Sequence, residues 1–169
     1  YVPSLYEVTY NEDGTICDFK PVNDEVPQTV GKVIVTDMKD SGYPKNPIVP
    51  FIKVTQDRCV LEIMRGCIRG CRFCQAGMVY RPRREKNVEE LKEIASQILK
   101  STGHEEISLS SLSSSDYSKL GDLVENLIEN CHKTGVNLSL PSLRIDAFSL
   151  DVMSKVQDIK KSSLTFAPE

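Results

Sequence analysis

Three cysteines lie close together near the middle of the chain, in the sequence CIRGCRFC. Cys67, Cys71 and Cys74 have the spacing C-x3-C-x2-C, and no fourth cysteine or nearby histidine completes the set. Soft thiolate ligands in a short loop suit zinc or an iron–sulfur cluster. A structural zinc site is normally closed by four ligands, and an ordinary iron–sulfur cluster also takes four thiolates. Three thiolates leave one iron of a cubane cluster open, and an open metal position is what catalysis needs.

A zinc site is the alternative, with Cys59, His104 or His132 as its fourth ligand. Cys59 lies eight residues upstream within an expected strand, and both histidines are distant in the sequence. Closed zinc sites usually show paired ligand spacing, which is missing here. The spacing therefore favours a cluster over zinc.

The residues around the cysteines predict a loop that follows a β-strand. CVLEIM, residues 59–64, is an apolar run of strand length, and the cysteine loop comes directly after Arg65 and Gly66. Loops at the ends of barrel strands are where barrel enzymes place their chemistry. We expect Gly66 and Gly70 to let the backbone turn tightly and to bring N–H groups to the cluster sulfurs.

The longer string MRGCIRGCRFCQAGMVYRPRRE, with the aromatic Phe73 before the last cysteine, resembles the cluster motif of the radical S-adenosylmethionine (SAM) superfamily. It resembles in particular a poorly characterised branch of large enzymes with an upstream B12-binding-like domain. The segments SLSSLSSSDY, LSLPSLRIDAF and SLTFAPE match the same branch. The resemblance extends from about Val2 to the last residue. It implies a 4Fe-4S cluster on Cys67, Cys71 and Cys74, with SAM bound at the open iron.

The resemblance also implies an activity. The reduced cluster would cleave SAM to a 5′-deoxyadenosyl radical that acts on an unknown substrate, with an external electron donor of flavodoxin or ferredoxin type. B12-dependent methylation in the full-length protein is one such reaction. Its cobalamin would bind a domain outside this chain, because the chain has no Asp-x-His-x-x-Gly motif. The alternatives are a tRNA-modifying methylthiotransferase-like enzyme and a non-catalytic metal- or iron–sulfur-binding module.

Further residues are expected around the cofactor. Relatives receive the methionine end of SAM in the loop that here contains Ser113, Ser115 and Asp116, often through a Gly-Gly-Glu motif that this chain lacks. Serine hydroxyls can still donate hydrogen bonds to a carboxylate. For Asp116, a simple role as a helix cap is slightly favoured. By resemblance Phe73 would line the adenine pocket, with packing in the core as the equal alternative.

Two more residues belong to the expected cofactor site. Arg144 lies among apolar residues, and a buried arginine needs a carboxylate partner to offset its charge. By resemblance it would help to hold the cofactor or an acidic neighbour, and the alternative is a structural ion pair with Asp146 or Glu62. Glu169 follows the last expected strand, where relatives place a polar residue near the ribose.

A basic segment surrounds and follows the cysteines, consisting of Arg65, Arg69, Arg72, Arg81, Arg83, Arg84 and Lys86. The anionic cluster and the cofactor carboxylate would be local partners for some of this charge. The remainder suits an anionic substrate such as RNA. A solvated face is the alternative, and is favoured for Arg83 and Arg84. Among the other cysteines, we expect Cys131 to lie in the core and Cys17 in a hairpin without a partner.

The elements around the site indicate an α/β fold. Residues 1–58 predict a small β-rich extension with a Pro-containing connector: LYEVTY and TICDFKPV flank a hairpin turn, and 32–38 is a third strand candidate. In residues 59–169, strands 59–64, 106–112, 137–143 and 163–167 alternate with helical stripes, one of which starts at Asn87 and ends at Gly103. Such units predict a parallel sheet. The resemblance implies the first part of an open (β/α)6 partial barrel, truncated after its fourth strand.

Length and composition limit the function further. The chain has 169 residues and a net charge of −3, so no overall basic character indicates nucleic acid. No run is long and apolar enough for a membrane span, and the first residues do not read as a signal peptide. Six cysteines with three clustered fit a reducing compartment, so we expect a cytoplasmic protein. The final strand has no following helix, and we expect the chain to be a fragment.

Overall fold

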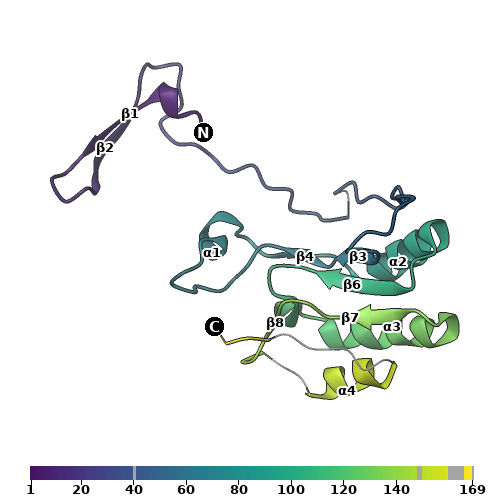
Figure 1. The fold of residues 1–169 in the computed structure, drawn as a ribbon. Helices are drawn as coiled ribbons and strands as arrows, with labels where there is room; N and C mark the ends of the chain where they lie inside the picture. The colour runs from purple at the N-terminus through teal and green to yellow at the C-terminus, as the bar shows by residue number, and fades with distance from the viewer. Residues whose placement is uncertain (40, 148–149, 160–165, 169) are drawn as a thin grey trace. The chain divides into compact units, whose positions relative to one another are not determined.

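The computed structural model describes residues 1–39, 41–147, 150–159 and 166–168, which form two compact units, Tyr1–Val35 and Thr36–Glu169 (Figure 1). The first unit is the expected hairpin. A 3-10 turn, η1 (Pro3–Leu5), leads into β1 (Tyr6–Tyr10), which pairs antiparallel with β2 (Ile16–Pro21). Gly14 takes φ +81° in the turn, a conformation open to glycine. The rings of Tyr6 and Phe19 stack at 4.7 Å and hold the two strands together.

The third strand predicted over residues 32–38 is wrong. The described residues between β2 and β3 contain no strand. The apolar run has no neighbouring strand to pair with, and Val33 is 95% exposed. An apolar run alone does not make a strand, since the backbone groups of a strand need a partner.

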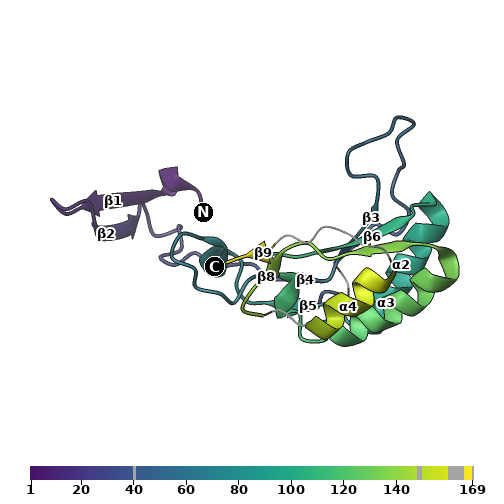
Figure 2. The same cartoon turned by 60° about the horizontal axis from the view of Figure 1, so that its bottom comes forward.

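The second unit is built on a parallel sheet of three strands in the order β3-β6-β7. These are β3 (Cys59–Glu62), β6 (Glu106–Ser110) and β7 (Asn137–Ser139), joined by α2 (Val88–Thr102) and α3 (Leu120–Thr134). Side chains alternate between the two faces of a strand. Leu61, Leu109 and Leu138 are buried on the face that α2 and α3 cover, and Figure 2 shows these helices on one side of the sheet.

The helix boundaries follow the sequence signals. The Asn87 side chain accepts a hydrogen bond from the N–H of Glu89 at 3.0 Å and caps the start of α2. Gly103 and Gly135, both at φ +71°, end α2 and α3. The apolar stripes of both helices, including Leu91 and Leu127, are buried in the core. Local sequence therefore fixes these two helices.

Two predicted strands are divided in the structure. After β3 the chain turns at Ile63 into β4 (Met64–Arg65), which pairs antiparallel with β5 (Arg84–Glu85). The predicted strand 137–143 breaks after β7, close to Pro141, and resumes as β8 (Leu143–Arg144). The break includes Ser142, whose φ of 59° is a left-handed value that no regular strand adopts.

The last elements form another βαβ unit. Strand β8 is followed by α4 (Leu150–Ile159) and by β9 (Phe166–Ala167), which pairs parallel with β8. The four described sheets confirm the α/β class that the sequence predicted. No helix in the described residues is long and apolar enough to cross a membrane.

Candidate functional site

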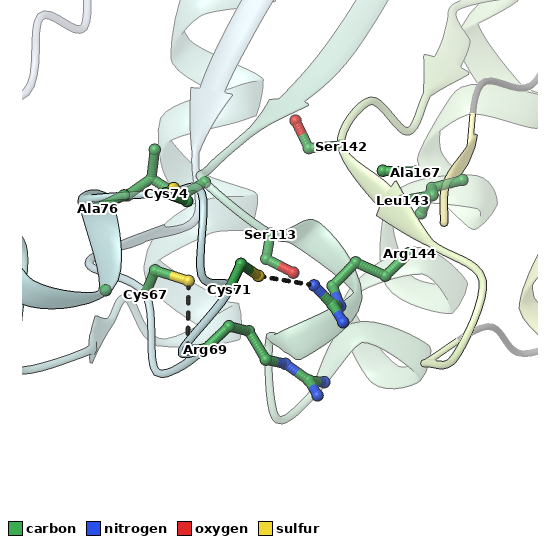
Figure 3. A pocket seen from close by; sticks show the side chains of 12 residues that line it. Cys67, Arg69, Cys71, Cys74, Ala76, Ser113, Ser142, Leu143, Arg144 and Ala167 are labelled. Carbon is green, nitrogen blue, oxygen red and sulfur yellow. Dashed lines mark hydrogen bonds between the residues drawn. The ribbon is translucent and has the colours of Figure 1, made fainter. Parts of the chain in front are cut away.

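The three clustered cysteines line one cavity of about 270 Å³ (Figure 3). Its walls come from four places in the second unit: the cysteine loop with α1 (Ala76–Val79), the loop after β6, strand β8 and strand β9. The lining residues are Cys67, Arg69, Cys71, Cys74, Ala76, Gly77, Leu112, Ser113, Ser142, Leu143, Arg144 and Ala167. Residues more than 90 positions apart in the sequence therefore meet at this cavity.

Two glycines shape the cysteine loop. Gly66 follows β4 at φ +94°, and a Cβ there would overlap the carbonyl oxygens of Tyr80 and Pro82. Gly77 lies buried in α1, where a Cβ would overlap the carbonyl oxygen of Arg69. The tight turn expected at Gly66 is thus confirmed, whereas Gly77 was missed because only the fold brings it against the loop.

The tight turn expected at Gly70 is not found. Its φ lies outside the left-handed region, and a Cβ at this position would have open space within 4 Å. The loop turns at Gly66, before the first cysteine, and is packed closely at Gly77, after the last. An ordinary side chain fits the backbone at position 70.

Two of the cysteine sulfurs accept hydrogen bonds from arginines. The backbone N–H of Arg69 donates to Cys67 Sγ at 3.4 Å, and the guanidinium Nη1 of Arg144 donates to Cys71 Sγ at 3.7 Å (Figure 3). Donors around a thiolate ligand stabilise its negative charge. These contacts suit the binding of a cluster through thiolates.

The donor set fits an iron–sulfur cluster better than a single ion. A single zinc needs all its sulfur ligands within about 2.3 Å, whereas a cubane cluster places its thiolates on separate irons. Among the described residues no three His, Cys, Asp or Glu side chains are grouped closely enough for one metal ion. The three thiols nevertheless share one cavity, which is the arrangement that ligands spread over several irons require.

The fourth ligands considered for zinc lie elsewhere. Cys59 is buried at the start of β3, at the opposite end from the cysteine loop, and burial raises the pKa of its thiol to about 11. His104 lies 3.3 Å from Asp57 and lines the same separate hollow as Cys59. His132 belongs to the last turn of α3. Cys131 is buried in the core, as expected, and Cys17 is exposed on β2.

A chain of ion pairs borders the cavity. Arg69 donates to both carboxylate oxygens of Asp116, with 2.9 Å from Nε to Oδ2, and its Nη1 lies 3.4 Å from Asp146. Arg144 binds the same Asp146 through two hydrogen bonds of 2.9 Å. The Arg69 guanidinium lowers the pKa of Asp116, and the Arg144 guanidinium lowers that of Asp146.

This arrangement shows which protein groups Asp116 and Arg144 bind. Asp116 does not cap α3, because its carboxylate is held by Arg69 and Lys119 occupies the cap position. Arg144 is buried and forms an ion pair with Asp146, one of the two carboxylate partners expected for it. The other expected partner, Glu62, instead binds Arg65 at 2.8 Å.

In the loop after β6, called the serine loop here, Ser113 and Ser115 make different contacts. Ser113 is buried against the cavity, and its hydroxyl has no hydrogen-bond partner within the described part of the chain. It lies close enough to Asp116 to contribute, after Arg69, to the lowered pKa of that carboxyl. The hydroxyl of Ser115 accepts a hydrogen bond of 3.0 Å from the N–H of Arg144. Ser113 therefore faces the cavity beside Asp116, while Ser115 holds Arg144 in place.

Phe73 does not pack into the core. It is 78% exposed and lines a second hollow of about 470 Å³ formed by the cysteine loop, α1 and Arg81. The core alternative is therefore wrong, since the ring is open to a ligand or partner. Glu169 lies outside the described residues.

The basic segment is largely used within the fold. Arg83 donates to the carbonyl oxygen of Asp116 at 2.6 Å, and Arg84 Nε to that of Pro82 at 3.1 Å. Arg83 is half-buried and also lies 3.4 Å from Glu85, so the solvated face favoured for it is wrong. The contact of Arg84 is at the exposed surface. The Lys86 ammonium is buried and donates to the carbonyl oxygen of Met38 at 2.8 Å. Arg72 is exposed.

Comparison with known proteins agrees with the motif. A sequence model of the Radical SAM superfamily matches residues 61–168, a range that includes every residue lining the cavity. The chain is also 30% identical over 168 aligned positions to the uncharacterized protein MJ0966 of Methanocaldococcus jannaschii. That alignment covers 93% of this chain and 36% of the relative, so the chain spans about a third of the relative's length. Because the family model matches residues 61–168 and the three cysteines of its motif line one cavity, this chain belongs to the radical SAM superfamily.

Proposed function

We propose that this chain is part of a radical SAM enzyme, in which Cys67, Cys71 and Cys74 hold a 4Fe-4S cluster. The observation that carries the proposal is the shared cavity of the three thiols, with two arginine N–H groups directed at their sulfurs. When bound, the cluster and SAM supply a one-electron reductive cleavage whose product, a 5′-deoxyadenosyl radical, abstracts hydrogen from a substrate. The protein binds, orients and shields these groups.

The remaining cavity residues would orient SAM. The buried Ser113 hydroxyl has a proton to donate to the cofactor carboxylate, and binding a ligand would satisfy it. Arg69, fixed by Asp116, holds the cysteine loop against the serine loop. Ser115 fixes the backbone of Arg144. The exposed ring of Phe73 is available to the adenine, and we keep Glu169 as a candidate contact of the ribose.

We further propose that residues 59–169 are the first part of an open (β/α)6 partial barrel in a longer protein, with residues 1–58 as an extension. The greater length of the archaeal relative supports this proposal. The longer protein would belong to the branch with a B12-binding-like domain, act in the cytoplasm and receive electrons from a flavodoxin- or ferredoxin-type donor. B12-dependent methylation is the reaction that this branch suggests.

Anaerobic reconstitution tests the ligand assignment. The protein is expected to bind four irons and four sulfides, with visible absorbance and a reduced-state spin signal. Changing Cys67, Cys71 or Cys74 to Ala should abolish both signals, whereas Cys17→Ala, an exposed cysteine on β2, should retain them. A cluster that survives loss of one of the three would refute the assignment.

Addition of SAM separates an enzyme from a structural cluster. SAM should change the spin spectrum of the reduced protein, because its amino and carboxylate groups take the open iron. Ser113→Ala should weaken this effect without reducing iron content. Iron and sulfide without any response to SAM would favour the non-catalytic module, and activity on tRNA would favour the methylthiotransferase-like alternative.

A further inference from the structure

Arg144 connects one thiol of the cavity to a network of charges. Its guanidinium is buried, donates through Nη1 to Cys71 Sγ at 3.7 Å, and binds both oxygens of Asp146 through its other nitrogens. Strand β8 supplies this residue, and Figure 3 shows its side chain directed at Cys71. The arginine thus has one face toward the cysteine loop and one toward a carboxylate.

Arg144 and its partner Asp146 differ in their exposure to water. The Arg144 side chain is only 7% exposed, whereas that of Asp146 is 49% exposed. Water screens a charge at the surface much more than a buried one. The carboxylate of Asp146 therefore offsets the positive charge of Arg144 only in part at the cavity, and it is also shared with Arg69 at 3.4 Å.

Charge near a cluster ligand changes the energy of adding an electron. Reduction makes a cluster with thiolate ligands more negative, and N–H groups that donate to the sulfurs stabilise the reduced form. A buried guanidinium at a ligand sulfur therefore raises the reduction potential. A carboxylate that neutralises this guanidinium has the opposite effect.

We propose that Arg144 and Asp146 act as a pair that sets the reduction potential of the cluster through Cys71. Arg144 raises the potential by its hydrogen bond to the sulfur, and Asp146 limits the rise by balancing the charge of Arg144. The inference rests on the proposed function, since it requires a cluster on Cys71. It assigns Arg144 a contact with the protein ligand of the cluster, separate from any contact with SAM.

A redox titration without SAM tests the pair. The reconstituted protein is titrated anaerobically with dithionite as the reductant, mediator dyes carry electrons to the cluster, and the reduced-state spin signal is the readout. We expect Arg144→Gln to lower the equilibrium constant for one-electron reduction by tenfold or more, a potential shift of about −59 mV. Asp146→Asn should move the potential in the opposite direction.

The matched control is Arg58→Gln. Arg58 pairs with Glu106 at 2.9 Å next to the start of β3, at the end of the sheet away from the cysteine loop, so the change removes a paired guanidinium at a distance. Its potential should equal that of the unchanged protein. Asp146→Asn keeps the test valid if Arg144→Gln does not fold, because the half-exposed carboxylate of Asp146 can be replaced by an amide of the same shape.

The outcomes separate this inference from the proposed function. Failure of the unchanged protein to bind a cluster overturns both. A normal cluster with equal potentials in all variants, or shifts of the same sign for Arg144→Gln and Asp146→Asn, overturns the inference alone. If Arg144→Gln fails to hold a cluster, the sign of the shift in Asp146→Asn decides. A shift in Arg58→Gln as large as the others also refutes a local effect at Cys71.

Discussion

Replacing Gly77 by alanine should disturb the cysteine loop. Gly77 is buried in α1, and its Cβ would overlap the carbonyl oxygen of Arg69. The obstructing atom belongs to the backbone, which cannot swing aside as the end of a long side chain can. The N–H of Arg69 also donates to Cys67 Sγ, so a shift at this residue reaches a predicted cluster ligand.

The size of the effect follows from the cost of overpacking. Adding a methyl group to a filled interior site typically costs about 1–3 kcal/mol. Domains are stable by only about 5–15 kcal/mol, so this loss is measurable. For a chain of this size, 1 kcal/mol corresponds to roughly 2–4 °C in melting temperature, which gives an expected decrease of about 2–12 °C.

Gly70→Ala provides the matched control in the same loop. A Cβ at position 70 has open space within 4 Å and no left-handed backbone to strain. Where the backbone is compatible, Gly→Ala stabilises by about 0.4–1 kcal/mol through the unfolded chain. We therefore expect Gly70→Ala to melt at the same temperature as the unchanged apoprotein or slightly above it.

Thermal unfolding of the apoproteins, followed by circular dichroism, measures the difference, and iron content after reconstitution shows its effect on the site. Gly77→Ala should melt lower and bind less iron than Gly70→Ala. Equal melting temperatures and equal iron content for the two variants would refute the close approach between α1 and the cysteine loop.

Three other outcomes are expected. Asp116→Asn should cost roughly 1–3 kcal/mol in urea unfolding at pH 7, because Arg69 loses a charged partner. Arg69 lowers the pKa of Asp116, so this stability is present above about pH 4 and lost as the pH falls through the lowered value. Lys86→Met should free the segment held at Met38, detected as faster proteolysis near that residue. Burial raises the pKa of the Cys131 thiol to about 11. The free energy of unfolding should therefore fall by about 2–3 kcal/mol as the pH rises from 9 to 11, and Cys131→Ala should reduce that fall.

Local sequence was sufficient for helices α2 and α3 and for placing the three clustered cysteines in one loop. The boundaries of α2 depend on Asn87 and Gly103, which act within one turn of the helix. The C-x3-C-x2-C spacing likewise keeps the three cysteines in one loop, whatever the rest of the fold does. Such features are predictable because the interacting groups are neighbours in the chain.

Features that depend on partners distant in the sequence were not predicted. Arg69 binds Asp116 across 47 positions. Gly77 is required by the backbone carbonyl of Arg69, which only the path of the cysteine loop brings against α1. The strand expected over residues 32–38 has the right composition, but the fold provides no neighbouring strand for it. Each of these outcomes is set by tertiary contact, which pattern and propensity do not encode.

Topology would have allowed part of the charge network to be found. The carboxyl ends of parallel strands meet at one edge of a sheet, which is where such folds bind ligands. The cysteine loop follows β3 and β4, Ser113 follows β6, and Arg144 belongs to β8, which pairs in parallel with β9. Charged residues after successive strands are therefore candidates to pair with one another. Applied to this chain, that rule brings Arg69 of the first loop and Asp116 of the second to the same edge, and the cavity follows from the order of the strands.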